Sequence, residues 1–68
     1  MRVDYSKNSD SAYIYLKDNI GDGEVKMTYP CDPLDVNGMI NLDFDKDGKL
    51  IGIEVLDASK KLPKELLK

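Results

Sequence analysis

Four acidic side chains in the second half of the chain have the types and spacing of a metal site: Asp43, Asp45, Asp47 and Glu54. With Gly48 they match the calcium loop of an EF-hand at each ligand position. An EF-hand also needs a helix on each side of its loop, but the residues on both sides here alternate between apolar and polar with a period of two, as strands do. In a hairpin at about 3.3 Å per residue, Asp47 and Glu54 would lie more than ~20 Å apart. We therefore interpret the pattern as a hairpin turn and predict no metal site and no cofactor.

Catalysis has little support in the remaining residues. The chain has no histidine, the commonest general base, and Cys31 is its one cysteine, which we interpret as an ordinary free thiol. Thirteen acidic residues in 68 make chance pairs of carboxylates unavoidable. Because a domain of this size has little room for a deep pocket, we expect no enzyme.

The charge is unevenly distributed along the chain. The net charge is −3, but residues 1–57 carry −6 and residues 58–68 carry +3. An acidic body argues against a nucleic-acid partner, because it repels phosphates. No apolar run approaches the ~20 residues that span a bilayer, and the first residues lack the apolar core of a signal peptide, so no membrane association is expected. With the free thiol, these features favour a cytoplasmic protein.

Hydrophobic periodicity predicts strands at about 2–6, 12–17, 24–29, 39–45 and 50–57. From Ser59 onward the period of two is lost, and three leucines give a short helix one apolar side. The sequence therefore predicts a single α+β domain over residues 1–68. It consists of an antiparallel sheet of four to five strands, built from hairpins over about 2–57, with one short C-terminal helix over about 59–67 packed on one face. The predicted core consists of Ala12, Ile14, Leu16, Ile40, Leu42, Phe44, Ile51, Ile53 and Val55.

The second face of this sheet is the candidate functional surface. Alternation places on it Tyr13, Tyr15, Met39, Leu50 and Leu56, and one small helix cannot cover two faces. We therefore expect an interaction module that uses these five residues to bind a second copy of itself, as a homodimer, or a small protein partner. The alternative is a module that binds a small ligand or a cation with the acidic hairpin Asp43–Glu54.

Three stretches also resemble a known family: Tyr5–Leu16, Asn41–Gly48 and Leu50–Ser59. Together they are similar to the family called domain of unknown function 2283, small prokaryotic proteins, from about Val3 to Pro63. The resemblance implies a small sheet with a helix, no assigned chemistry, and a hairpin at the acidic stretch. Some members are associated with toxin-like partners, so the resemblance also implies an antitoxin-like regulatory role.

Overall fold

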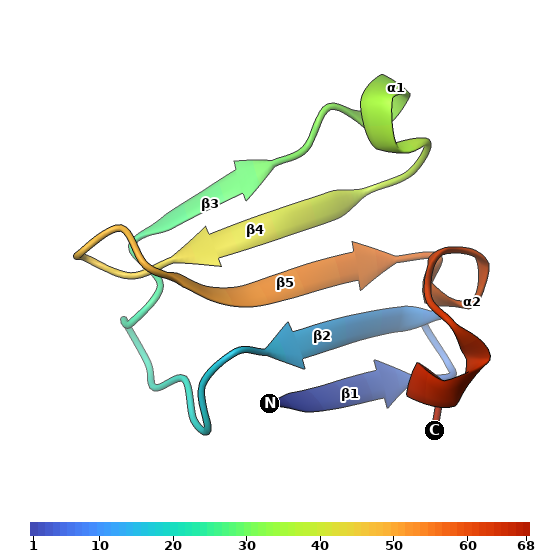
Figure 1. The fold of residues 1–68 in the computed structure, drawn as a ribbon, viewed down its shortest axis with the longest axis horizontal. Helices are drawn as coiled ribbons and strands as arrows, with labels where there is room; N and C mark the ends of the chain where they lie inside the picture. Colours follow the sequence, from blue (N-terminus) through green and yellow to red (C-terminus); the bar gives the residue numbers. More distant parts are fainter.

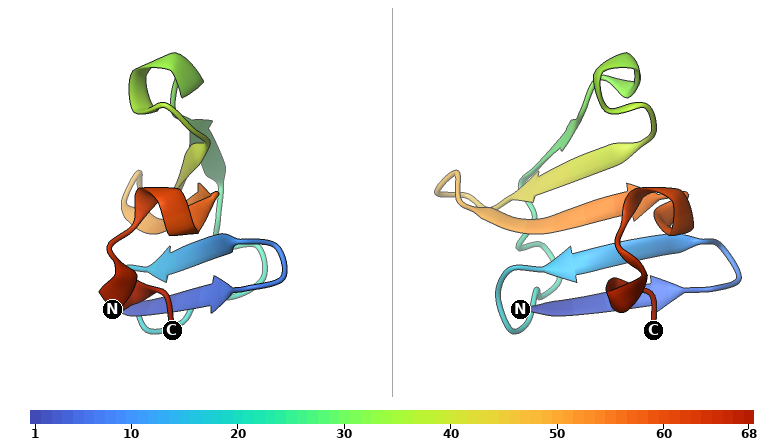
Figure 2. Two further views of the ribbon diagram at one scale, coloured as in Figure 1. Left: turned by 90° about the vertical axis from the view of Figure 1, so that its right-hand side faces the viewer. Right: turned by 45° about the vertical axis from the view of Figure 1, so that its right-hand side comes forward.

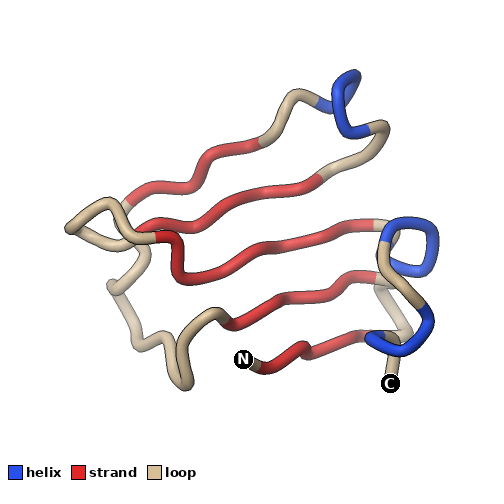
Figure 3. Tube along the Cα trace, in the orientation of Figure 1, coloured by secondary structure: helices blue, strands red, loops and turns tan.

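A computed structural model describes all 68 residues and shows one five-stranded antiparallel sheet with short helices (Figure 1). The strands lie in the order β1-β2-β5-β4-β3 (Figure 3). This confirms the predicted α+β class and the antiparallel sheet. The strand bounds are β1 (Arg2–Ser6), β2 (Ser11–Tyr15), β3 (Met27–Pro30), β4 (Ile40–Phe44) and β5 (Leu50–Leu56).

Two hairpins form the body of the sheet, as the turn residues predicted. In the first, β1 and β2 are joined by a four-residue polar turn that ends at Asp10, which has a positive φ of 50°. In the second, β4 and β5 are joined at the acidic tip, and β5 takes the central position between β2 and β4. The third strand begins at Met27, later than predicted, and pairs with the outer side of β4 as an edge strand.

The tip between β4 and β5 is shaped by Asp45 and Gly48. The Oδ1 atom of Asp45 accepts the backbone N–H groups of Asp47 and Lys49, both at 2.9 Å. Gly48 donates its N–H to the Asp45 carbonyl at 3.0 Å and has a φ of 79°, which side-chain-bearing residues rarely adopt. The predicted tight turn is confirmed.

The helical parts differ from the prediction in two ways. The C-terminal tail is split into α2 (Ala58–Lys61) and a 3₁₀ turn, η1 (Lys64–Leu66), because Pro63 between them is extended and has no N–H to continue the helix. A further one-turn helix, α1 (Pro33–Val36), forms where a loop was predicted. The Asp32 carboxylate accepts the Leu34 N–H at 2.9 Å, and a proline at the first helical position is favourable.

The core lies between the tail and one face of the sheet, here called the helix side. Ala12, Val55 and Ala58 form its buried centre. Of the predicted core, Ala12, Ile51 and Val55 are buried, while Leu16 is 39% exposed. Leu16 follows the end of β2 that lies away from the tail, so no helix covers it (Figure 1).

The tail covers only part of the helix side. It lies against the ends of β5, β2 and β1, and none of the helical segments lies over the length of β3 and β4 (Figures 1 and 2). The molecule is a slab with extents of 31 × 27 × 17 Å, and only five of its 68 residues are buried. None of its helices has the length and the apolar character that crossing a membrane requires.

Candidate functional site

An uncovered apolar surface lies on the helix side of β3 and β4. Register pairs Met27 with Phe44 and Tyr29 with Leu42, and Leu42 in turn pairs with Ile53, which packs against the core. Because residues that pair directly across antiparallel strands share a face, all these side chains lie on the helix side. We call Met27, Tyr29, Leu42 and Phe44 the bare patch. Met27 is 53% and Tyr29 is 55% exposed, so its outer half is open to solvent.

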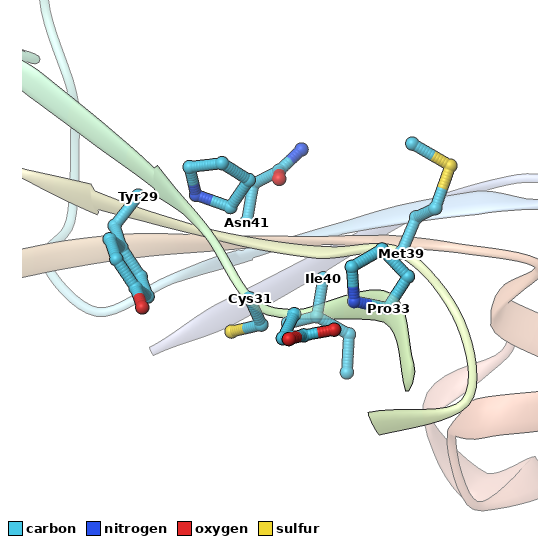
Figure 4. Close-up of a pocket in the computed structure, with 8 residues that line it drawn as sticks. Tyr29, Cys31, Pro33, Met39, Ile40 and Asn41 are labelled. Atoms are coloured by element: carbon cyan, nitrogen blue, oxygen red, sulfur yellow. The ribbon is translucent and has the colours of Figure 1, made fainter. Parts of the chain in front are cut away.

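A hollow of about 330 Å³ lies where the end of β3, the start of α1 and the start of β4 meet, and Tyr29 of the bare patch is one of its lining residues. In Figure 4 the side chains of Tyr29, Cys31 and Ile40 lie on one side of the strands, and those of Met39 and Asn41 lie on the other. Next to the hollow, Leu34 in α1 is 91% exposed. Four large apolar side chains that are more than half exposed lie in β3, in α1 and just before β4: Met27, Tyr29, Leu34 and Met39.

The edge of β3 is poorly suited to pairing with another strand. The Cys31 N–H donates to the Ile40 carbonyl at 2.9 Å, and the same register directs the backbone groups of Thr28 and Pro30 away from β4. Pro30 has no N–H, so within β3 only Thr28 offers an outward donor. A proline at a sheet edge disfavours strand addition. The face of β3, rather than its edge, is therefore its available binding surface.

The opposite face, here called the open side, is organised around Tyr13. Its ring crosses β5 above Gly52, where a Cβ atom would lie only 2.0 Å from the Tyr13 oxygen. The hydroxyl donates to Oδ2 of Asp43 at 2.6 Å, and the Thr28 hydroxyl donates to Oδ1 of the same carboxylate at 2.6 Å. Burial, followed by the hydrogen bond to Asp43, raises the pKa of Tyr13. This network connects β2, β4 and β3 across the face.

Tyr15 extends the same row toward β1. Its ring meets the Tyr13 ring edge-on, with centroids 4.9 Å apart, and the Arg2 guanidinium lies 4.0 Å from the centroid of the Tyr15 ring. The two tyrosines therefore share one face, as alternation predicted, and each has partners within the chain. Their role in an interface stays a prediction.

The other predicted interface residues do not all join this row. Leu56 and Met39 lie at the opposite end of β5 from Leu50, and the Leu56 N–H donates to the Met39 carbonyl at 3.0 Å. Leu50 lies beyond a register shift and pairs with Phe44, a residue of the bare patch. Such an irregularity interrupts strict alternation, which had placed Leu50 with the tyrosines.

The residues of the EF-hand-like pattern are spread along the β4–β5 hairpin, which consists of two strands and a turn and contains no helix. Asp43 is bound by Tyr13 and Thr28, and Oε1 of Glu54 accepts the Asn41 side-chain amide at 2.9 Å. Asp45 is held within the tip, where the Lys49 N–H in particular lowers the pKa of its carboxyl group. Each of these three carboxylates therefore has local donors that explain its position.

One polar residue that the sequence analysis did not single out joins the first hairpin to the tail. The Asp10 carboxylate accepts the Ser59 hydroxyl at 2.7 Å, the Ser59 N–H at 3.0 Å and the Tyr5 hydroxyl at 2.8 Å. Its backbone carbonyl accepts the Ala58 N–H at 2.9 Å. The hydrogen bonds from Ser59 and then Tyr5 lower the pKa of Asp10. In sequence it was one of several turn-formers, and nothing local marked its contact with residue 59.

The model of the family described as protein of unknown function (DUF2283) matches residues 2–59, so the chain belongs to that family. The match covers the whole sheet and the start of α2. No curated protein and no solved structure matches the chain.

Proposed function

We propose that this protein is a non-catalytic interaction module that binds another protein chain through the bare patch, as a homodimer or as a subunit of a small complex. The observation that carries the proposal is the incomplete cover of the helix side. One half is packed around Ala12, Val55 and Ala58, while Met27 and Tyr29 on the other half are more than half exposed. Exposed apolar surface next to a packed core is typical of a protein–protein contact.

The composition of this surface fits the same function. Tyrosine and methionine are enriched at protein interfaces, because they supply large apolar area and, for tyrosine, a polar tip. Leu34, at 91% exposure, adds a further apolar side chain beside the hollow. An antitoxin-like regulator is one form that such a binding protein takes, and a cytoplasmic setting is consistent with the free thiol of Cys31.

The two other candidate surfaces have less support. On the open side, Tyr13 and Tyr15 are half-buried and already contact Asp43 and Arg2. In the acidic hairpin, ligand or cation binding would compete with the donors that Asp43 and Asp45 already have. We therefore rank the bare patch first.

A photo-crosslinking experiment in the cells that make the protein tests the proposal. A benzophenone side chain is placed at Tyr29, which lies in the bare patch, and in a matched variant at Lys7, which is exposed in the turn between β1 and β2. We expect a discrete protein adduct from position 29 and none from position 7. Adducts from neither position would overturn the proposal. A third variant at Tyr15 shows whether the open side is the contact surface instead.

A further inference from the structure

The exposed area of the chain is larger than its mass predicts. Its accessible surface is 4947 Å² at 7.7 kDa. Compact monomers of that mass expose about 4,300 Å², which leaves an excess of roughly 600 Å². The Cα radius of gyration is 12.0 Å, against about 11 Å for a compact domain of this length. A stable dimer buries about 800 Å² on each partner, so the excess is of the size that one protein contact removes.

The charges of the tail and of the β3–α1–β4 segment are complementary. Residues 27–44 contain three acidic side chains and no basic one, a balance of −3, whereas residues 58–68 have a balance of +3. Lys64 and Lys68 in the tail are exposed, and so is Asp35 in α1. A surface that carries both signs in separate regions can match a second copy of itself.

The positions of the two regions allow this match to be reciprocal. The tail and α1 lie at the same end of the sheet, the tail over β5, β2 and β1, and α1 at the connection from β3 to β4 (Figure 1). A two-fold axis parallel to the strands, in the plane between two facing copies, keeps that end aligned. It places the half of one sheet that carries the tail opposite the half of the other sheet that has no tail. Each tail then faces the bare patch and α1 of the partner.

Lys61 fixes α1 beside α2 within each copy. Its Nζ donates to the Val36 carbonyl at the end of α1 at 2.7 Å, and its side chain packs over Gly38, where a Cβ atom would lie 2.6 Å from Cε. The position of the acidic α1 relative to the basic tail is therefore fixed before any partner binds. This pre-organisation lowers the entropic cost of binding.

From these four observations we infer that the occupant of the bare patch is a second copy of this chain, related by a two-fold axis parallel to the strands, with the basic tail of each copy against the α1 end of the other. The inference rests on the proposed function and names its partner. The bare patch supplies the apolar contact, and the tail lysines and Asp35 set the orientation.

Sedimentation equilibrium of two charge-reversed variants tests the inference. In Lys64→Glu and in Asp35→Lys, both symmetric tail contacts become repulsive, and we expect dimerisation to weaken at least fivefold in each. In an equimolar mixture, a dimer of one copy of each variant has two attractive contacts. In one contact, the new glutamate at position 64 of one copy faces the new lysine at position 35 of the other. In the second contact, the unchanged Lys64 faces the unchanged Asp35. We therefore expect the mixture to form dimers as tightly as the wild type. Lys46→Glu has the same charge change as Lys64→Glu but lies in the β4–β5 tip, at the opposite end of the sheet from the tail (Figure 1), and is expected to leave dimerisation unchanged.

Three outcomes would overturn the inference. They are a wild-type monomer at high micromolar concentration, a mixture that associates no better than its components, or an equal loss in Lys46→Glu. Circular dichroism on each variant confirms that the chain is folded. A wild-type monomer whose position 29 nevertheless crosslinks to another protein in cells would refute the homodimer and leave the proposed function standing. If the wild type forms no dimer and position 29 gives no crosslinked adduct, both the homodimer and the proposed function are refuted.

Discussion

At the scale of single residues, Gly52 and Tyr13 form the most constrained contact of the molecule. Glycine within a strand costs some β propensity, but here it provides the space through which the Tyr13 ring reaches Asp43. Gly52 does not have a positive φ, so the requirement for glycine comes from the ring above it and not from the backbone. The residue at position 52 must therefore be glycine for as long as the Tyr13 ring occupies the space above it.

Replacing Gly52 by alanine is expected to lower the free energy of unfolding by about 1–3 kcal/mol, because the new methyl group must displace the Tyr13 ring and break its hydrogen bond. Chemical denaturation measures this loss. In the Tyr13→Ala background the same substitution should cost much less, since the clash is gone. Gly21→Ala, whose Cβ would meet its nearest atom at an ordinary 3.6 Å, is the matched control. Equal losses in both backgrounds would disprove the coupling.

Asp10 gives the fold a dependence on acid pH. Its pKa is lowered in the folded state by the hydrogen bonds from Ser59 and Tyr5. A carboxyl group with a lowered folded pKa contributes stability above its unfolded pKa of about 3.9, and that contribution is lost as the pH falls through the folded value. The connection between the first hairpin and the tail therefore weakens in acid.

We expect Asp10→Asn to reduce the melting temperature at neutral pH and to reduce it progressively less as the pH falls below the unfolded pKa, because the wild-type carboxyl then takes up a proton as well. Thermal melts across this range measure the difference between the two proteins. The lowered pKa values of Glu24 and Asp45 act in both proteins and cancel in that difference. A difference that stayed constant with pH would show that the ionised Asp10 carboxylate is not what connects the hairpin to the tail.

At the scale of elements, the acidic hairpin shows how a metal-like pattern arises from turn chemistry. Asp45 accepts the N–H groups of its own turn, Gly48 has the positive φ, and Asp43 faces Tyr13 and Thr28. Asp43, Asp45 and Gly48 of the calcium pattern therefore each have a structural role in the sheet.

Calcium added up to millimolar concentration is therefore expected to change the melting temperature by less than about 1 °C, because stabilisation grows only when the ligand exceeds its dissociation constant. Differential scanning fluorimetry is sufficient to measure this. A rise of several degrees at micromolar calcium, abolished in Asp47→Asn, would show that the tip binds the ion and would reverse our interpretation of the pattern.

The elements differ in how far the sequence predicts them. Both hairpins follow from local chemistry: a polar turn before Ser11, and Asp45 with Gly48 at the tip. The strand order does not, because nothing in β5 itself indicates that it lies between β2 and β4. The alternation rule failed at Leu50, where a register shift interrupts it. The predicted C-terminal helix is present but divided into α2 and η1, because Pro63 between them is extended.

The candidate site was predictable only in part, for the same reason. Alternation places Tyr13 and Tyr15 on one face. Their partners Asp43 and Arg2 lie on other strands, β4 and β1, and the register of those strands against β2 is set by the tertiary fold and not by local sequence. The bare patch does not follow from the sequence, which predicts one helix packed on that face and does not indicate how much of the face the helix leaves open. The coverage depends on where the tail turns after Asp57, and there the backbone has a positive φ of 51° that the sequence did not indicate.

At the scale of the whole molecule, the chain is a thin sheet with one face partly covered and few buried residues. A domain of this size has a marginal core, and association is one of the few ways left to stabilise it, because the chain has a single cysteine. We propose that this association uses the bare patch on the helix side and not the tyrosine row on the open side.

Light scattering on three purified proteins tests that claim most directly: the wild type, Tyr29→Ser in the bare patch and Tyr15→Ser in the tyrosine row. Each substitution removes one tyrosine ring from a strand of the same sheet, Tyr29 from the helix side and Tyr15 from the open side, so each serves as the control for the other. The account predicts that the wild type associates, that Tyr29→Ser weakens association at least tenfold, about 1.4 kcal/mol, and that Tyr15→Ser leaves it nearly unchanged. Loss of association in Tyr15→Ser with full association in Tyr29→Ser would contradict the account.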